Sequence, residues 1–485
     1  QSLATCPVLR YHFTSYVVFG KASGFSAAMN LSSLDGSNGF SLDGVAAHDA
    51  LGWSVSGAGD INGDGFDDVI IASTSPGKSE PYGDNPLVSY VVFGKASGFE
   101  ATLDISSLDG SNGFRLDGLV GFGSPFLNTS VSGAGDVNGD GFDDLIVGAV
   151  GTSPNGIGSG SSYVVFGKAS GFNATLDLFS LDGSNGFRLD GVAEYDFSGR
   201  SVSSAGDVNG DGFADLIVGA YGADSNDSDV GSSYVVFGKA AGFDATLDLP
   251  SLDGSNGFRL DGETASDQSG ISVSSAGDVN GDGFADLLVG AFGADPNGES
   301  SGSSYVVFGK AAGFTAILDL SSLDGSNGFR LDGVAAYDLS GGSVSSAGDV
   351  NGDGFADLIV GAIFADPNGN YSGSSYVVFG KAAGFTAILD LSSLNGSNGF
   401  RLDGAATYDT SGRSVSSAGD VNGDGFADLL VGAIGATSGD IYSGASYVIF
   451  GGNFNGQVTA MGTAGADKLK GSAAVDRIVA RDGDD

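Results

Sequence analysis

Residues 207–215 read DVNGDGFAD, and this nonapeptide recurs five more times along the chain with small changes. From the second copy onward, successive copies start 71 residues apart. A fixed period of this length is typical of a repeat architecture, in which each copy belongs to one structural unit. A chain of 485 residues exceeds the usual size of a single-core domain, and repetition accounts for that length. The six copies begin at Asp60, Asp136, Asp207, Asp278, Asp349 and Asp420.

Two other segments recur with the same period. The segment SYVVFG or a close variant occurs seven times, and LDGSNGFRLDG occurs six times with small variations. In the unit that spans residues 199–262, the pattern predicts four short strands, over residues 201–205, 216–220, 233–237 and 257–260. No segment shows the 3.6-residue period of a helix. Sets of four strands with almost no helix predict an all-β fold, a β-propeller of four-stranded blades.

The number of blades depends on the two ends of the chain. The third type of strand occurs seven times and the other three types six times. Seven blades result if residues 1–14 and 452–462 donate missing strands to the terminal blades. Six result if the strand at Phe40 instead completes the blade that starts near Gly412. Seven blades are favoured, because the extra SYVVFG segment otherwise has no place.

Composition excludes several classes of function. The formal charge is −40, from 59 acidic and 19 basic residues, and such a surface repels nucleic acids and anionic membranes. No apolar run approaches the roughly 20 residues of a membrane-spanning helix. Cys6 is the single cysteine, so no disulfide forms within the chain. The excess of acidic residues calls for a counter-ion.

The nonapeptide has the oxygen spacing of a calcium loop. In the copy at 207, side-chain oxygens stand at positions 1, 3, 5 and 9, and the carbonyl of Phe213 stands at position 7. Position 12, which is Glu in an EF-hand, is Val218, so this loop joins two strands rather than two helices. Asp-Gly and Asn-Gly pairs also make tight turns, which would account for a single copy. Because six copies occur in the same register, they favour Ca²⁺ binding. We expect the ions in the hairpins between the first and second strands of the blades. Mg²⁺ holds its waters more tightly, and no histidine or cysteine spacing suits Zn²⁺.

We therefore predict about six Ca²⁺ ions per chain, one in each loop. The candidate ligands in chain order are Asp60, Asn62, Asp64, Phe66 and Asp68; Asp136, Asn138, Asp140, Phe142 and Asp144; Asp207, Asn209, Asp211, Phe213 and Asp215; Asp278, Asn280, Asp282, Phe284 and Asp286; Asp349, Asn351, Asp353, Phe355 and Asp357; and Asp420, Asn422, Asp424, Phe426 and Asp428.

A strand, a D-x-N-G-D-G-x-x-D loop and an apolar DLIVGA strand, in this order, resemble the FG-GAP repeat of integrin α subunits and of bacterial integrin-α-like surface proteins. The resemblance covers roughly residues 12–452. It implies a propeller, usually of seven blades, with calcium bound at hairpins on one face. The namesake Phe-Gly is commonly Ser-Gly here, as at Ser198-Gly199. The ligand-binding partner domain of many integrin α subunits is absent, so the resemblance does not imply their ligand binding.

The remaining segments flank the expected propeller of residues 15–452. Residues 1–14 are atypical and are the candidate closing strand. Residues 453–485 form a linker and a tail, in which Gly462 to Lys470 fits the nonapeptide of RTX-type calcium-binding β-rolls at every fixed position.

The favoured function is non-enzymatic. Almost every polar residue is repeated six times, and repeated residues more often hold a scaffold than catalyse a reaction. The recurring Lys168 and Arg188 are interpreted as surface or strand-edge charges. We expect an extracellular or cell-surface protein that acts in adhesion or in matrix or filament assembly, with a protein or glycan ligand. Its terminal strands are candidates for self-assembly. Two alternatives remain: a carbohydrate-binding lectin, with inter-blade loops at Tyr195, Tyr337 and Tyr408, and the scaffold domain of a secreted hydrolase or lyase.

Overall fold

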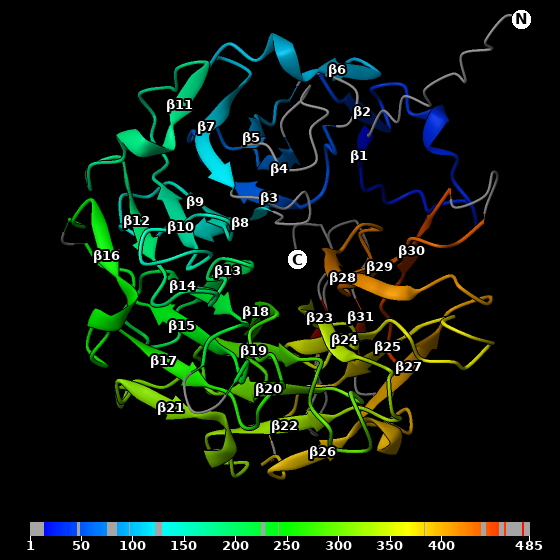
Figure 1. Ribbon diagram of the computed structural model, residues 1–485. Helices are drawn as coiled ribbons and strands as arrows, with labels where there is room; N and C mark the ends of the chain where they lie inside the picture. Colours follow the sequence, from blue (N-terminus) through cyan, green and yellow to red (C-terminus); the bar gives the residue numbers. More distant parts are fainter. Residues whose placement is uncertain are drawn as a thin grey trace, which may run out of the picture.

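The computed structural model is a β-propeller with seven radial sheets around one axis (Figure 1). This confirms the predicted fold class and the seven-bladed alternative. The structure describes residues 14–45, 49–74, 85–96, 98–121, 129–224, 228–240, 242–382, 384–437, 443–454, 460–461 and 478–479.

The blades are numbered 1 to 7 in chain order, and their strands are given from the axis outward. Blade 1 contains β1 (Thr14–Val18), β2 (Gly39–Asp43) and β6 (Thr102–Asp104). Blade 2 contains β3 (Val55–Gly59), β4 (Asp68–Thr74), β5 (Asn85–Val92), β7 (Gly113–Gly121) and β11 (Thr175–Asp177). Blade 3 contains β8 (Thr129–Gly135), β9 (Asp144–Ala149), β10 (Ser161–Val165), β12 (Gly186–Asp190) and β16 (Thr246–Asp248). Blade 4 contains β13 (Ser201–Gly206), β14 (Asp215–Ala220), β15 (Ser232–Val236), β17 (Gly257–Asp261) and β21 (Ile317–Asp319).

The later blades become smaller toward the end of the ring. Blade 5 contains β18 (Ser272–Gly277), β19 (Asp286–Ala291), β20 (Ser303–Val307), β22 (Gly328–Asp332) and β26 (Ile388–Asp390). Blade 6 contains β23 (Ser340–Gly348), β24 (Asp357–Ala362), β25 (Ser374–Val378) and β27 (Gly399–Asp403). Blade 7 contains β28 (Ser411–Gly419), β29 (Asp428–Ala433) and β30 (Ala445–Ile449). A separate two-residue parallel ladder joins β31 (Ala460–Met461) to β32 (Ile478–Val479).

Helical structure in the described residues is limited to six single 3₁₀ turns, and none of them is long or apolar enough to cross a membrane. In most of these turns the residue before the turn caps it, as Asp177 does by accepting a hydrogen bond from the backbone N–H of Phe179. The turns are η1 (Leu31–Ser33), η2 (Ile105–Ser107), η3 (Leu178–Ser180), η4 (Leu249–Ser251), η5 (Leu320–Ser322) and η6 (Leu391–Ser393).

The four strands predicted for the unit of residues 199–262 are all present, as β13, β14, β15 and β17 of blade 4. They pair antiparallel in sequence order, with Val218 opposite Tyr234 and Tyr234 opposite Arg259. The four strands thus form a meander, in which the long connection from β15 to β17 contains β16 and η4.

A fifth strand in blades 2 to 5 was not predicted. A three-residue segment of each following repeat, TLD or ILD, pairs in parallel with the fourth strand of the preceding blade. In blade 3, Thr246 of β16 lies opposite Arg188 of β12. The interpretation of Arg188 as a strand-edge charge is therefore wrong, and its guanidinium pairs with the Asp190 carboxylate at 2.7 Å.

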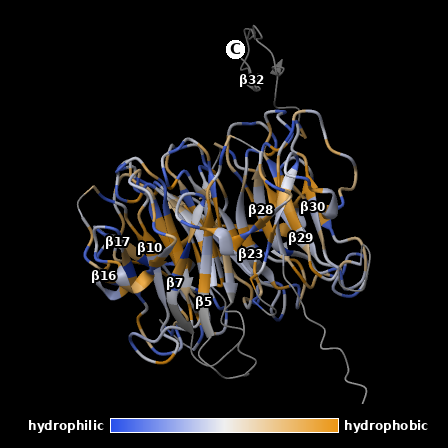
Figure 2. Ribbon diagram, turned by 90° about the horizontal axis from the view of Figure 1, so that it is seen from above, coloured by the Kyte–Doolittle hydropathy of each residue, from blue (hydrophilic) through white to orange (hydrophobic). Residues whose placement is uncertain are grey.

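The apolar core lies between neighbouring blades. Side chains of a strand alternate between the two sheet faces, so Val235 of β15 faces blade 5 while Tyr234 and Val236 face blade 3. Each interface between complete blades thus forms its own buried cluster. In the side view, apolar residues run along the strands and polar residues gather in the loops of the two faces (Figure 2).

The first and last sheets are neighbours in the ring. The backbone N–H of Lys21, after β1, donates to the carbonyl of Val421 in blade 7 at 2.8 Å. The equivalent hydrogen bond joins other neighbouring blades, for example from the backbone N–H of Lys168 in blade 3 to the carbonyl of Ile61 in blade 2. Blade 1 therefore lies next to blade 7 and closes the ring. Since blade 1 has no D-x-N-G-D-G-F-x-D loop, the seven blades carry six such loops.

Two predictions about the chain ends stay untested. Residues 1–13 of the candidate closing strand lie outside the described residues, and so does the nonapeptide from Gly462 to Lys470. Within 452–462, the structure describes a short strand, β31, which pairs with β32.

Candidate metal centres

The six Asp-rich loops all occupy the same place in their blades. Each connects the innermost strand to the second strand, as residues 207–214 connect β13 to β14. The predicted position in the hairpin between the first and second strands is therefore confirmed for all six loops, and the loops lie together on one face of the ring. Blade 1 has no such loop, since the described residues give it neither of these two strands.

Within a loop, the first aspartate organises the backbone. In the copy at 207, Oδ1 of Asp207 accepts hydrogen bonds from the backbone N–H groups of Gly210 at 2.7 Å and Asp211 at 3.0 Å. Its Oδ2 accepts from the N–H of Gly212 at 2.9 Å. Gly210 and Gly212 have φ of 75° and 90°, a left-handed conformation that glycine adopts without strain. The Asp-Gly and Asn-Gly pairs thus make the turn, and the carboxylate holds it closed.

The aspartate at position 9 is different because it is buried. Asp215 is the first residue of β14 and is fully shielded from solvent. Its two oxygens accept hydrogen bonds from the backbone N–H groups of Val208 and Gly238, each at 2.9 Å. Burial, together with the charges of Asp211 and Asp207, raises the pKa of Asp215 to about 7, against the lowering effect of these two hydrogen bonds.

The same pattern recurs in the other loops. Burial, and then the charges of the two other loop aspartates, raise the pKa of Asp68 and Asp286 to about 7 and that of Asp144 and Asp357 to about 8. The pKa of Asp428 is raised for the same reasons. A carboxylate buried beside two like charges is stabilised in its ionised form by a cation.

The donor set fits a hard cation, although the described residues do not gather three carboxylates around one point. The carboxylate oxygens are instead turned toward backbone N–H groups. In the described part of the chain, two position-3 oxygens have no hydrogen-bond partner: Oδ1 of Asn351, whose residue is fully buried and whose Nδ2 is also unpaired, and Oδ1 of Asn422. A buried amide oxygen without a hydrogen bond is costly, and a metal ion would supply the missing partner. In each loop, the side chains at positions 1, 3, 5 and 9 would hold the ion with the carbonyl at position 7.

The phenylalanine at position 7 has a structural role that the sequence analysis missed. Its ring packs on the loop of the preceding blade, so a Cβ added to Gly139 would lie 2.3 Å from Cε1 of Phe213. The backbone N–H of Ala214 also donates to the carbonyl of Asp136 in that loop, at 3.1 Å. The loops are therefore linked to one another around the ring. The recurrence of Phe at one position in all six copies was the available signal.

Comparison with known protein families matches this arrangement. The FG-GAP repeat matches six segments that together cover half of the chain: residues 51–86, 127–165, 198–236, 269–307, 340–378 and 411–461. The chain belongs to the FG-GAP repeat family. Each matched segment contains one Asp-rich loop with the strands on either side of it. The resemblance expected from the sequence is confirmed for the six repeats; an RTX-like tail stays a prediction.

Several curated FG-GAP relatives are integrin α subunits. The chain is 31% identical to integrin alpha-5 of Xenopus laevis over 197 residues, which are 38% of this chain and 17% of the relative. It is 29% identical to integrin alpha-V of Gallus gallus over 252 residues, 50% of this chain and 21% of the relative. A phosphatidylinositol-glycan-specific phospholipase D of Bos taurus is 34% identical over 183 residues, 35% of this chain and 20% of that enzyme. The chain thus spans about a fifth or less of each relative.

Proposed function

We propose that this FG-GAP propeller is an extracellular, calcium-stabilised module that acts without catalysis in adhesion at a cell surface or in a matrix. The observation that carries the proposal is the set of six equivalent loops on one face, each with a buried aspartate beside two others. Likeness to integrin α subunits supports an adhesive role, and calcium is abundant outside cells.

Calcium would act on the fold as well as on single loops. Each loop contacts the loop of a neighbouring blade, so an ion that fixes one loop also fixes an interface between blades. Because ligands that bind only the folded state stabilise it, calcium should raise the melting temperature strongly.

The proposal is tested by counting metal and measuring stability on the same sample. We expect about six Ca²⁺ ions per chain by elemental analysis after dialysis against micromolar calcium. Calorimetry should show a large fall in melting temperature when a chelator is added, and recovery with calcium but not with an equal concentration of magnesium. A chain that binds no calcium and melts at the same temperature in chelator contradicts the proposal.

A carbohydrate-binding role is the second candidate, because exposed tyrosines lie on the face opposite the metal loops. Tyr195, Tyr337 and Tyr408 are each more than half exposed and have φ of 67°, 68° and 67°, respectively. Left-handed backbone is strained for such residues and often marks a functional position. A glycan array probed in calcium and in chelator separates carbohydrate binding from adhesion to a protein. If no glycan on the array binds, a protein ligand is favoured.

The phospholipase D relative motivates a third reading, in which the propeller is the scaffold domain of a secreted hydrolase or lyase. A hydrolase screen with the isolated chain tests the non-enzymatic proposal directly: turnover would contradict it, and the screen should show none.

A further inference from the structure

Two arginines occupy the same position in two blades on opposite sides of the ring axis. Arg200 directly precedes β13 of blade 4, and Arg413 lies near the start of β28 of blade 7. Figure 1 shows these two inner strands on opposite sides of the axis. Both arginines follow a glycine with left-handed backbone, Gly199 with φ of 85° and Gly412 with φ of 87°, so the chain enters both strands in the same way.

This position lies on the face opposite the metal loops. Each inner strand leads into its metal loop, so the start of the strand lies at the other face. Every copy has a Ser-Val pair here, but only blades 4 and 7 have arginine before it. The corresponding residues of blades 2, 3, 5 and 6 are Trp53, Thr129, Ile271 and Gly342.

The two guanidinium groups are close enough to interact. Burial, together with the charge of Arg413, lowers the pKa of Arg200. Like charges repel each other, and an opposite charge between them would stabilise both. Arg200 is partly buried and Arg413 is exposed, so salt screens this repulsion only in part while the site stays accessible from solvent.

Neither arginine is neutralised by an acid. In the described part of the chain, Arg200 and Arg413 have no carboxylate within ion-pair distance, although the whole chain has 59 acidic and 19 basic residues. The arginines that do form ion pairs with carboxylates are Arg115, Arg188, Arg259, Arg330 and Arg401. Two unpaired cations thus lie together in a molecule with a formal charge of −40.

A tyrosine adjoins this pair. Burial raises the pKa of Tyr221, and the charge of Arg200 acts in the opposite direction, so the hydroxyl lies near the guanidinium. The Tyr221 ring stacks on Phe197 with ring centroids 5.4 Å apart, which fixes its orientation. In blades 3, 5, 6 and 7 the corresponding residue is apolar: Val150, Phe292, Ile363 and Ile434. Blade 4 therefore adds a hydroxyl donor where these blades have none.

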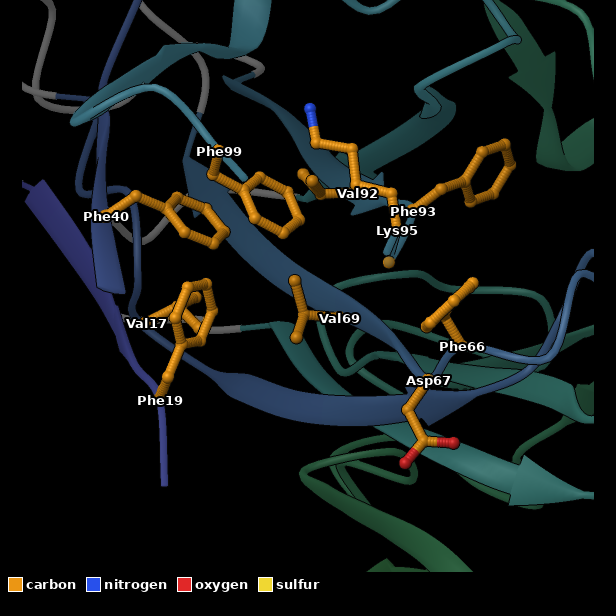
Figure 3. A pocket seen from close by; sticks show the side chains of 11 residues that line it. Val17, Phe19, Phe40, Phe66, Asp67, Val69, Val92, Phe93, Lys95 and Phe99 are labelled. Atoms are coloured by element: carbon orange, nitrogen blue, oxygen red, sulfur yellow. The ribbon is translucent and has the colours of Figure 1, made fainter. Parts of the chain in front are cut away.

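The cavity between blades 1 and 2 offers no comparable site for an anion. It has a volume of about 210 Å³, and Figure 3 shows Phe19, Phe40 and Phe99 among its lining side chains. Its ammonium group, that of Lys95, lies 4.5 Å from the centroid of the Phe99 ring. An apolar lining does not compensate for the lost hydration of an anion, so the arginine pair is the better candidate.

We propose that Arg200 and Arg413 bind a compact oxyanion with two negative charges at the axis, with the Tyr221 hydroxyl as a third donor. Guanidinium groups present planar pairs of N–H donors that match the oxygens of sulfate and carboxylate groups. Two guanidinium charges balance one dianion. An extended polyanion does not fit, because the rest of the molecule repels it. The site goes beyond the proposed function, since it lies on the other face and uses none of the candidate metal ligands.

Isothermal titration calorimetry on the full chain tests the site, with sodium sulfate and disodium succinate as the two probes. The titrations are made in saturating calcium, with NaCl at matched ionic strength as the blank. We expect one-to-one binding of at least one probe, which weakens as NaCl rises. Tighter binding of sulfate identifies a sulfate-type group as the guest, and tighter binding of succinate identifies carboxylates. If neither dianion binds, the proposal is wrong.

Variants of the full chain locate the site. Arg413→Gln and Arg200→Gln should each weaken binding by about tenfold or more, and Tyr221→Phe by about threefold. Arg115→Gln is the matched control, because Arg115 is exposed on blade 2 and pairs with Asp117. Its affinity should equal that of the parent. Unchanged affinity in Arg413→Gln, or the same loss in Arg115→Gln, overturns the proposal.

Melting temperatures give a readout that a merely structural arginine would not produce. Without the dianion, Arg413→Gln should melt higher than the parent, because the repulsion of Arg200 is gone. In saturating dianion the order should reverse, since the parent gains stability from binding. The same order in both solutions contradicts the proposal. Calcium counts test the proposed function independently of this result.

Discussion

One residue type performs two tasks in each loop, and its place in the chain decides which. Asp207 at position 1 is accessible and closes the turn through three backbone N–H groups. Asp215 at position 9 starts a strand and is buried, where it joins its own loop to the segment after the third strand. The carboxylate of Asp207 tolerates the absence of a cation better than that of Asp215, because water can solvate it.

Replacing the turn-closing aspartate should remove one site. In Asp207→Ala, the N–H groups of Gly210, Asp211 and Gly212 lose their acceptor, which should lower the free energy of unfolding by about 2 kcal/mol. Calcium analysis should give one ion fewer per chain. Asp244→Ala is the control, because Asp244 is exposed and lies outside the loops. Unchanged stoichiometry in Asp207→Ala would show that this loop does not hold metal.

A second buried aspartate predicts a pH effect away from the loops. Burial, with a smaller contribution from the charges of Glu263 and Asp295, raises the pKa of Asp267 to about 6, although the N–H of Thr264 and the charge of Arg330 act in the opposite direction. The folded state therefore keeps a proton that the unfolded state releases near pH 4. Stability from this group is complete below pH 4 and is lost as pH rises to about 6.

Asp267→Asn removes that dependence. As the pH rises from 4 to 6.5, the melting temperature of the variant should therefore rise relative to that of the parent. Calorimetry at constant calcium and ionic strength measures it. A difference that stays constant over this range would mean that Asp267 does not take up a proton on folding.

At the scale of elements, the sequence was sufficient where the signal lay inside one repeat. The strand over residues 216–220 is an apolar run between Asp and Gly, and the loop before it has a fixed oxygen spacing. Both were predicted at the right place. The fifth strand was not predicted, since Thr246 to Asp248 is three residues long and pairs in parallel with another repeat. Nor does local sequence show that Asp215 is buried and Asp207 is not, because neighbouring blades create that difference.

The fifth strand is held by an aromatic pair that crosses between repeats. Phe243, after β15, stacks on Phe187 of β12 with ring centroids 4.2 Å apart, and the Lys239 ammonium lies 4.6 Å from its ring centroid. These contacts attach the segment before β16 to the blade that precedes it. They explain why Lys, Gly and Phe recur together in the KAxGF segments.

Truncating this ring should loosen the outer strand. Phe243→Ala should lower the free energy of unfolding by roughly 3 kcal/mol, because a buried aromatic leaves a cavity. Hydrogen exchange should increase at the amides of residues 246–248. Phe179→Ala provides the comparison, since Phe179 is 59% exposed and its loss should cost less than about 1 kcal/mol. Equal effects of the two substitutions would rule out the proposed attachment.

At the scale of the whole molecule, the contacts between blades make the ring, while charge opposes it. Inner strands are joined in turn, as when the N–H of Val202 donates to the Ser130 hydroxyl of the preceding blade at 3.2 Å. Against this stands a formal charge of −40. Six Ca²⁺ ions carry twelve positive charges and would reduce it to −28. Repulsion between like charges destabilises a compact state, so the ions should reduce electrostatic repulsion over the entire ring as well as in each loop.

This charge balance predicts a link between calcium and salt. In chelator, raising NaCl from 10 to 150 mM shortens the Debye length from about 30 to about 8 Å and should raise the melting temperature. In saturating calcium the same salt step should have a smaller effect, because less charge remains to be screened. Calorimetry over a salt series measures both slopes, with magnesium at equal concentration to match ionic strength. If the melting temperature depends equally on salt in calcium and in chelator, the loops take up no net charge. If magnesium reduces this dependence as much as calcium does, the effect is nonspecific screening.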